Sequence, residues 1–249
     1  MHPDNLVAHR GIPAQFPGNS LQGLDAALKL GIKYLEFDIQ ISSDGVPVLF
    51  HDANLKRETG VNTRVEDLTW NQLQKIKFKR HNGAKSHFLT SLKSAVELLS
   101  HYPSSTVFIE VKRAAILKYG IVDVEEAIYK ILKPIANKTV PISIHKGFLL
   151  HVRQKWKTPI GWICETFKEQ NQKQAKILQP DYLFANMDNL SITQLQPPVE
   201  WQWAIYETSD PKVAKKWLKS GATLIESNDV ATMLGFFGKT DNGKAKNIK

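Results

Sequence analysis

Eight short apolar segments recur along this chain of 249 residues, and stretches with the spacing of amphipathic helices lie between them. The segments are residues 5–9, 34–41, 107–111, 141–144, 160–164, 182–185, 202–206 and 223–227. The first helical stretch shows the pattern well, because Leu21, Leu24, Ala27 and Leu28 recur three or four positions apart and Gly31 follows them. Short buried strands that alternate with helices are typical of an α/β protein, and eight such units predict a closed (β/α)8 barrel, the TIM barrel.

The barrel repeat accounts for most of the chain but not for all of it. We expect residues 1–238 to form a single domain, since one barrel routinely takes about 250 residues. Residues 53–90 are extra to the repeat and follow a predicted hairpin on the second strand, so we expect them to form a small cap beside the active site. Residues 239–249 are polar and rich in lysine, which predicts a disordered basic tail.

The overall charge excludes some classes of partner. The formal net charge is +9, but the lysines are spread over predicted helix faces with glutamates between them, so we expect no nucleic-acid partner.

The chain has no apolar stretch of about eighteen residues and no signal peptide at its start, which predicts no stable membrane insertion. The lone Cys164 agrees with a reducing compartment, and we expect a cytoplasmic protein. Nothing in the sequence indicates an oligomeric state.

Two carboxylates lie in the second apolar segment. Glu36 and Asp38 are two residues apart, and strand side chains alternate between faces, so both point to the same side. Two carboxylates inside an apolar run repel each other unless a positive charge joins them, which favours a bound cation. Taken alone, the spacing also fits a solvated strand end or a structural ion pair.

A hairpin is predicted to return the chain to these carboxylates. Asp44 and Gly45 form a tight-turn signal between two apolar runs, and a turn centred on them sets Asp38 opposite His51. A histidine beside carboxylates and a cation is suited to proton transfer. The alternative for the His51–Asp52 pair is a local arrangement that caps a strand end.

The third apolar segment adds a carboxylate and a cation. Glu110 and Lys112 are again two residues apart on one face of a strand. Three carboxylates without a cysteine or histidine cluster favour one hard divalent cation, Mg²⁺ or Ca²⁺, over zinc. An internal ion pair between Glu110 and Lys112 is the alternative.

The first apolar segment ends in His9, Arg10 and Gly11. The planar guanidinium of Arg10 can hold two phosphate oxygens, and Gly11 permits a tight turn close to a ligand. The alternative is a strand-end turn with a buried, hydrogen-bonded histidine.

These motifs, in this order, resemble the glycerophosphodiester phosphodiesterase family of the phospholipase C-like superfamily, and the resemblance runs along nearly the whole chain. The segments that carry it are HRG at 9–11, E-x-D at 36–38, DG at 44–45, HD at 51–52, E-x-K at 110–112, and the late stretches 203–206 and 221–229. The chain departs from the family where Gly18 replaces a glutamate, Tyr206 replaces an asparagine, and Glu226 interrupts an apolar run.

The resemblance implies a metal-dependent hydrolase that converts a small glycerophosphodiester into glycerol 3-phosphate and an alcohol. In that family the positions of Glu36, Asp38 and Glu110 hold the metal. Those of Arg10 and Lys112 would bind the phosphate. His9 and His51 would be the catalytic acid and base, in an order that the sequence leaves open.

Two further residues are candidates for substrate binding. Trp203 would form an apolar wall, or else pack in the core. Glu165 follows the fifth segment and would contact substrate hydroxyls, or else pair with a lysine. The other functions that we consider are a lysophospholipase D that acts on lipid phosphodiesters, and a barrel that binds phosphodiesters without turning them over.

Overall fold

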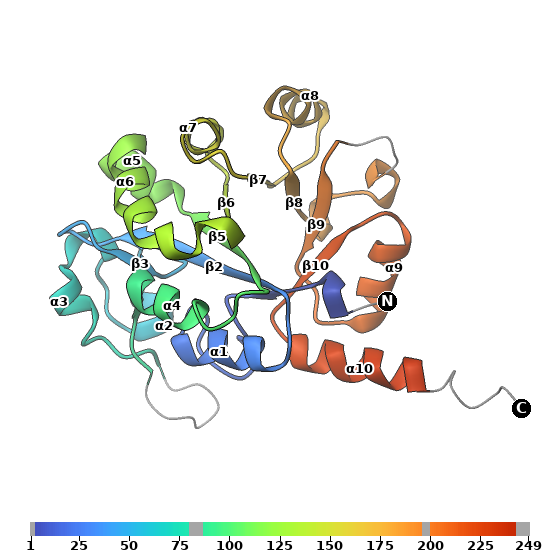
Figure 1. The fold of residues 1–249 in the computed structure, drawn as a ribbon, viewed down its shortest axis with the longest axis horizontal. Helices are drawn as coiled ribbons and strands as arrows, with labels where there is room; N and C mark the ends of the chain where they lie inside the picture. Colours follow the sequence, from blue (N-terminus) through green and yellow to red (C-terminus); the bar gives the residue numbers. More distant parts are fainter. Residues whose placement is uncertain (1–2, 80–86, 196–199, 243–249) are drawn as a thin grey trace, which may run out of the picture.

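Among the residues that the computed structural model describes, which are 3–79, 87–195 and 200–242, eight parallel strands form a closed barrel (Figure 1). They are β1 (Leu6–His9), β2 (Tyr34–Ile41), β5 (Thr106–Val111), β6 (Thr139–Ser143), β7 (Gly161–Cys164), β8 (Tyr182–Asn186), β9 (Gln202–Tyr206) and β10 (Leu224–Ser227). Pairing of β1 with both β10 and β2 closes the ring. The predicted TIM barrel is confirmed.

Helices surround the barrel (Figure 1). They are α1 (Leu21–Lys29), α4 (Leu92–Leu99), α5 (Arg113–Tyr119), α6 (Ile121–Leu132), α7 (Lys146–Trp156), α8 (Glu169–Leu178), α9 (Pro211–Lys219) and α10 (Val230–Asn242). Local chemistry sets where some begin: the hydroxyls of Ser20 and Ser91 accept hydrogen bonds from backbone amides in the first turns of α1 and α4. The described part of the connection from β8 to β9 forms only two short 3-10 turns, Met187–Asn189 and Ile192–Leu195, so this unit departs from the repeat.

Two apolar layers hold the barrel together. The larger packs the outward side chains of the strands against the helices, and the smaller fills the inside of the barrel. The inner layer consists of Val7, Phe108, Val140, Ile142, Phe184, Ala204 and Leu224. Since strand side chains alternate, the residue two positions after an inner-layer residue also points inward, one level closer to the carboxyl ends. Three of those next positions are His9, Glu110 and Glu226 of the candidate site, and Glu36 follows in the same way from Tyr34, which packs against the inner layer.

The hairpin on β2 exists, but its register differs by one residue from the prediction. Ile39 lies opposite Leu49 of β3 (Pro47–Leu49), and the amide of Phe50 donates to the carbonyl oxygen of Asp38 at 3.2 Å. Asp38 is therefore opposite Phe50, and the prediction that it faces His51 across the hairpin is wrong. The turn contains three residues instead of two, and its last residue, Gly45, takes the left-handed conformation with φ +80°.

The extra segment after the hairpin has a small core of its own. It contains α2 (Lys56–Thr59), a 3-10 turn (Val65–Asp67), α3 (Trp70–Leu73) and β4 (Thr90–Ser91), which pairs with β3. The buried residues of this core come from both the hairpin and the extra segment, and they are Val48, Phe50, Leu55, Val65, Leu73, Phe78 and Leu89. Positions 80–86 of the predicted insertion lie outside the described residues.

The predicted disordered tail is wrong in its first part, because α10 continues to Asn242 and so includes residues 239–242. The remainder of that prediction, residues 243–249, lies outside the described residues. Among the described helices, none combines the length and the apolar character that are needed to cross a membrane.

Candidate active site

A cavity of about 710 Å³ opens at the carboxyl ends of the barrel strands, a size that suits a small organic ligand. Its lining includes His9, Glu110 and Glu226, which end or nearly end their strands, and Glu36, which is the third residue of β2. The sheet register explains their proximity. His9 of β1 is paired with Glu36 of β2, and Asp38 of β2 is paired with Glu110 of β5.

Asp38 is the most heavily bonded carboxylate of the site. It is completely buried, and its Oδ2 lies 2.9 Å from Nε of Arg10 and accepts a 2.8 Å hydrogen bond from the amide of Asn19. Its Oδ1 accepts from Nζ of Lys112 at 3.2 Å. Burial alone would raise the pKa of Asp38, but Arg10 and Lys112 hold it well below its usual range. Asp38 is therefore ionised at neutral pH.

Glu36 and Glu110 are less well neutralised. Burial and the neighbouring charges of Asp38 and Glu226 raise the pKa of Glu36 well above its usual value, and its Oε1 has no hydrogen-bond partner among the described residues. Burial and Asp38 raise the pKa of Glu110 to about 7, although its Oε1 accepts a 2.6 Å hydrogen bond from Lys112. Buried carboxylates with these shifts attract a cation.

Glu36, Asp38 and Glu110 fit a hard divalent cation. Each offers a carboxylate oxygen, and these oxygens all lie within 4.8 Å of one another. The unpartnered Oε1 of Glu36 is available to a metal ion, and an all-oxygen set suits Mg²⁺ or Ca²⁺. The structure brings together the three carboxylates that the sequence analysis singled out.

Arg10 is held against these carboxylates by the turn that follows β1. Its φ is +55°, and its backbone amide donates to the carbonyl oxygen of Glu36 at 3.0 Å and to Oε2 of Glu36 at 3.2 Å. The side chains of Arg10 and Lys112 are 20% and 16% exposed, so both cations line the cavity.

His9 has one ring nitrogen fixed and the other directed to the cluster. Nδ1 lies 2.6 Å from Oε2 of Glu207 and 2.9 Å from Oδ1 of Asn228, which are both acceptors, so Nδ1 carries a hydrogen. Nε2 lies 3.9 Å from Oε2 of Glu36. Burial lowers the pKa of His9, but Glu226 and Glu207 outweigh it, and the net direction is upward.

His51 also lines the cavity, in a different environment. Its Nδ1 lies 2.6 Å from Oδ1 of Asp52, whose carboxylate also accepts two hydrogen bonds from Arg57 at 2.6 and 3.0 Å. Burial, together with the positive charges of Arg10 and Lys112, lowers the pKa of His51. The two histidines are therefore shifted in opposite directions.

One predicted substrate residue is not in the cavity. Trp203 is 1% exposed and packs edge-on against Phe167 and Trp201 in the outer apolar layer. The prediction of a substrate wall at Trp203 is corrected, because Ala204 takes the inward position of β9 and its alternation places Tyr206 in the cavity instead. Glu165 does line the cavity.

Four residues of the site were not predicted as such: Asn19, Glu207, Glu226 and Asn228. Glu226 carried a signal, because it interrupts an apolar strand two positions after the inward Leu224. The other three lie in connections, where no period indicates which way a side chain points.

Comparison with known proteins agrees with this geometry. A family model described as the Glycerophosphoryl diester phosphodiesterase family matches residues 9–216. The protein named Glycerophosphodiester phosphodiesterase 1 from Bos taurus is 30% identical over 155 residues, which cover 60% of this chain and 45% of that protein. The Glycerophosphodiester phosphodiesterase of Bacillus altitudinis is 27% identical over 150 residues, which cover 58% of this chain and 59% of that protein. Each match thus covers less than two thirds of the relative.

Solved structures share the fold. An Oleispira antarctica phosphodiesterase in complex with the product sn-glycerol-3-phosphate superposes with a TM-score of 0.82 at 20% identity, covering 94% of this chain and 96% of the other. A Thermotoga maritima glycerophosphodiester phosphodiesterase gives 0.74 at 20% identity, covering 95% and 99%. The family model spans most of the residues that form the barrel, and the resemblance inferred from the motifs is confirmed: this chain belongs to the Glycerophosphoryl diester phosphodiesterase family.

Proposed function

We propose that this chain hydrolyses glycerophosphodiesters to glycerol 3-phosphate and an alcohol, with the help of one divalent cation. The observation that carries the proposal is the meeting of Glu36, Asp38 and Glu110 with two cations and two histidines in one cavity. The relatives named as glycerophosphodiester phosphodiesterases and the product held by the Oleispira antarctica protein support it.

The charged residues divide into two groups by task. Glu36, Asp38 and Glu110 would hold Mg²⁺ or Ca²⁺, which neutralises charge on the phosphate. Arg10 and Lys112 would bind the phosphate oxygens, and both already lie at the cavity beside Asp38.

The opposite directions of the pKa shifts of the two histidines support a division of roles between them in the first step. The downward direction of the His51 pKa favours its neutral form, so His51 would take the proton from the glycerol hydroxyl that attacks phosphorus. The upward direction of the His9 pKa favours its protonated form, so His9 would give a proton to the departing alcohol oxygen. The cyclic phosphate that forms is then opened by water, with the two roles reversed, to give glycerol 3-phosphate.

The wall of the cavity on the insertion side favours an organic substituent on the substrate. Phe50 and Phe78 from the hairpin and insertion, and Phe16 from the turn after β1, line the cavity. We propose that residues 53–90 act as a cap within a single barrel domain, and that Glu165 contacts substrate hydroxyls. The same apolar wall makes a lysophospholipase D activity on lipid phosphodiesters the second candidate, since such a substrate needs an apolar surface beside the phosphate site.

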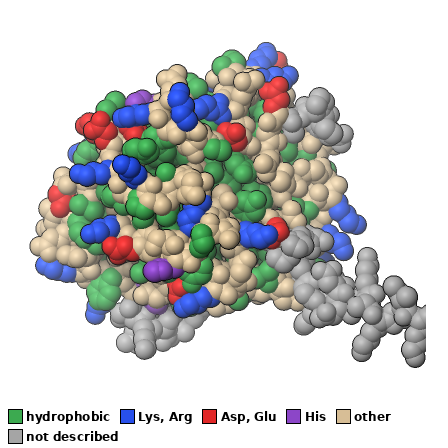
Figure 2. Space-filling view, in the orientation of Figure 1, with side chains coloured by type: hydrophobic (Ala, Val, Ile, Leu, Met, Phe, Trp, Pro, Cys, Tyr) green, Lys and Arg blue, Asp and Glu red, His purple; other side chains and the backbone are tan. Residues whose placement is uncertain are grey.

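The proposed partner is a small molecule and not a nucleic acid. On the face shown in Figure 2, lysine and arginine side chains lie apart from one another among acidic and neutral ones. We propose a cytoplasmic location, supported by a composition with a single cysteine.

The test is release of glycerol 3-phosphate from glycerophosphocholine and from a lysophospholipid, in the presence of Mg²⁺, Ca²⁺ or a chelator. We expect turnover that requires the metal and falls at least about 100-fold in Glu36→Gln. The matched control is Glu169→Gln, the same change at an exposed position of α8, which should keep full activity.

Activity that persists in chelator and in Glu36→Gln would refute the metal-dependent mechanism. Binding of glycerol phosphate without turnover of any phosphodiester would favour a barrel that binds but does not catalyse.

A further inference from the structure

Glu226 is a buried carboxylate that has no step of its own in the proposed reaction, although its charge raises the pKa of His9. It is 4% exposed, on the inward face of β10 directly above Leu224, and its Oε1 has no hydrogen-bond partner among the described residues. An unpaired buried carboxylate is costly, so its place in this barrel calls for a positive partner.

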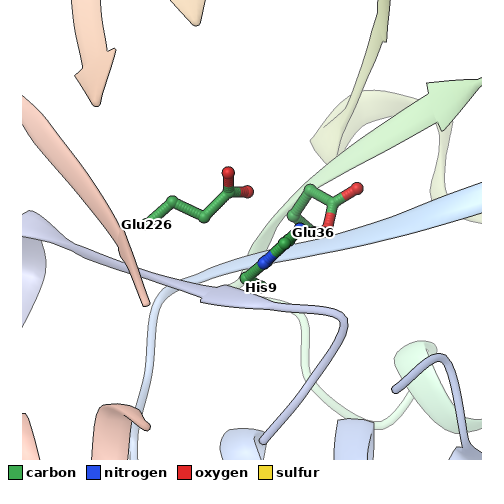
Figure 3. Close-up of side chains that lie close together, drawn as sticks. All are labelled: His9, Glu36 and Glu226. Atoms are coloured by element: carbon green, nitrogen blue, oxygen red, sulfur yellow. Dashed lines mark ion pairs between the residues drawn. The ribbon is translucent and has the colours of Figure 1, made fainter. Parts of the chain in front are cut away.

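Glu226 converges with two other side chains from neighbouring strands. Figure 3 shows the carboxylate of Glu226 directed toward Glu36, with the imidazole of His9 beside Glu36. One ligand atom from each residue lies within 4.8 Å of the other two. Glu36 is common to both groups: its unpartnered Oε1 is available to the all-oxygen site, and its Oε2 lies 3.9 Å from Nε2 of His9.

His9 is oriented as a metal ligand would be. A histidine that binds a metal through one nitrogen usually donates the hydrogen of the other to a carboxylate or carbonyl oxygen, which fixes the ring. Here Nδ1 contacts Glu207 and Asn228 at 2.6 and 2.9 Å, and Nε2 is left facing the cluster.

The lysine and arginine side chains nearest the cluster form their salt bridges with other carboxylates. Arg10 and Lys112 both direct their side-chain nitrogens to Asp38, and Lys112 also reaches Glu110. No salt bridge of a lysine or arginine to Glu36 or Glu226 is found among the described residues, and Glu36 receives only the backbone amide of Arg10.

We propose that His9, Glu36 and Glu226 form a second cation site, adjacent to the all-oxygen site and sharing Glu36 with it. One imidazole nitrogen with two carboxylates suits a borderline transition metal such as Zn²⁺ better than Mg²⁺ or Ca²⁺. Zn²⁺ there replaces the proton on Nε2 of His9, which is released to solvent, so the ion inhibits the reaction in which His9 is the acid.

The inference shares His9 and Glu36 with the proposed function, but the binding site does not depend on turnover. Two of its measurements therefore concern binding alone. A chain that binds Zn²⁺ at this site and hydrolyses nothing overturns the proposed function and leaves the second site intact.

The first measurement uses equilibrium dialysis to determine how many Zn²⁺ ions the Mg²⁺-saturated full chain binds, and with what affinity. We expect one tight Zn²⁺ site, weakened at least about tenfold in Glu226→Gln, since loss of even an outer hydrogen-bond partner costs a metal site that much. The control is Glu58→Gln, the same change in the wall of the same cavity, which should leave the affinity within about twofold. Equal affinity in Glu226→Gln and wild type overturns the proposal.

The second measurement needs no variant at Glu226, in case that substitution prevents folding. In the wild-type chain with ¹⁵N-labelled histidine, ¹¹³Cd²⁺ as a stand-in for Zn²⁺ should show scalar coupling to Nε2 of His9, whose signals are identified by their loss in His9→Gln. Saturation with ¹¹³Cd²⁺ without that coupling overturns the proposal. If the chain is active, Zn²⁺ should inhibit Mg²⁺-supported turnover, and Glu226→Gln should require at least about tenfold more Zn²⁺ for the same inhibition.

Discussion

At the residue scale, Gly11 directly follows His9 and Arg10 in the turn after β1 and packs closely against α1. Gly11 has φ +86°, and a Cβ at this position would lie 2.5 Å from the carbonyl carbon of Gly23 and 2.7 Å from its oxygen. These atoms belong to the backbone of α1, so they cannot move aside as the end of a flexible side chain could. Gly18 differs, because a Cβ there would meet only the side-chain atoms of Arg10, at 3.4 and 3.5 Å, and of Pro13.

The two glycines should therefore respond differently to the same substitution. We expect Gly11→Ala to lower the free energy of unfolding by about 2–5 kcal/mol, from an unfavourable φ and an overpacked contact. Gly18→Ala should stay within about 0.5 kcal/mol of wild type. Urea unfolding followed by circular dichroism measures both, and similar losses at the two positions would contradict the role given to Gly11.

The assignment of His9 as acid and His51 as base predicts how substitutions depend on the leaving group. With glycerophosphocholine, His9→Ala and His51→Ala should each lower kcat by about 100- to 10,000-fold. A p-nitrophenyl ester of glycerol phosphate leaves without protonation, so the defect of His9→Ala should shrink at least about tenfold while that of His51→Ala persists. The experiment compares kcat for the two substrates, and rescue of His51→Ala instead would reverse the assignment.

At the scale of single elements, Glu125 joins two outer helices. Glu125 in α6 is completely buried, and its carboxylate accepts hydrogen bonds from Nζ of Lys155 at 2.5 Å and from the indole of Trp156 at 2.6 Å, both in α7. Burial would raise the pKa of Glu125, but the bonds to Lys155 and Trp156 lower it overall.

This joint should contribute to stability in a pH-dependent way. We expect Glu125→Ala to lower the free energy of unfolding by about 2–4 kcal/mol at pH 7, since it leaves Trp156 without its acceptor. A carboxylate whose folded pKa is below its unfolded value stabilises the fold above the unfolded pKa, and loses that effect as pH falls through the folded pKa. The difference between wild type and Glu125→Ala should therefore be constant near neutral pH and narrow below about pH 4.5. A difference that grows on acidification would exclude this role.

The alternation of side chains along a strand explains what the sequence could predict about the site and what it could not. Alternation of side chains along β2 is a local property, so Glu36 and Asp38 could be placed on one face without any knowledge of the fold. The hairpin register depended on whether the turn holds two or three residues, which the sequence around Gly45 leaves open because both turn types accept a glycine. The prediction for Trp203 failed for a related reason. A shift of one residue along β9 exchanges the inward and outward faces of the strand, and an aromatic side chain can pack on either face.

At the scale of the whole molecule, the candidate site gathers negative charge although the chain as a whole is positively charged. The chain carries a formal charge of +9, yet five carboxylates gather at the carboxyl ends of the barrel strands, and of the four described lysine and arginine residues that line the cavity, Arg10 and Lys112 are the two that form salt bridges with them. The five are Glu36, Asp38, Glu110, Glu207 and Glu226. Without a metal ion, this excess of negative charge should oppose folding, and a divalent cation that binds only the folded barrel would relieve it.

The melting temperature should therefore rise with Mg²⁺ or Ca²⁺. At a cation concentration of 100 times the Kd, the added stability is about 2.7 kcal/mol, which for a chain of this size raises Tm by about 5–10 °C. Differential scanning calorimetry in chelator and in excess cation measures the shift, with NaCl at equal ionic strength as the control for screening. Glu36→Gln should lose the shift and yet begin at a metal-free Tm at least equal to that of wild type, because it removes the repulsion with Asp38 and Glu226. A variant that is merely damaged would begin lower, so the two temperatures together separate loss of the cation from loss of the fold.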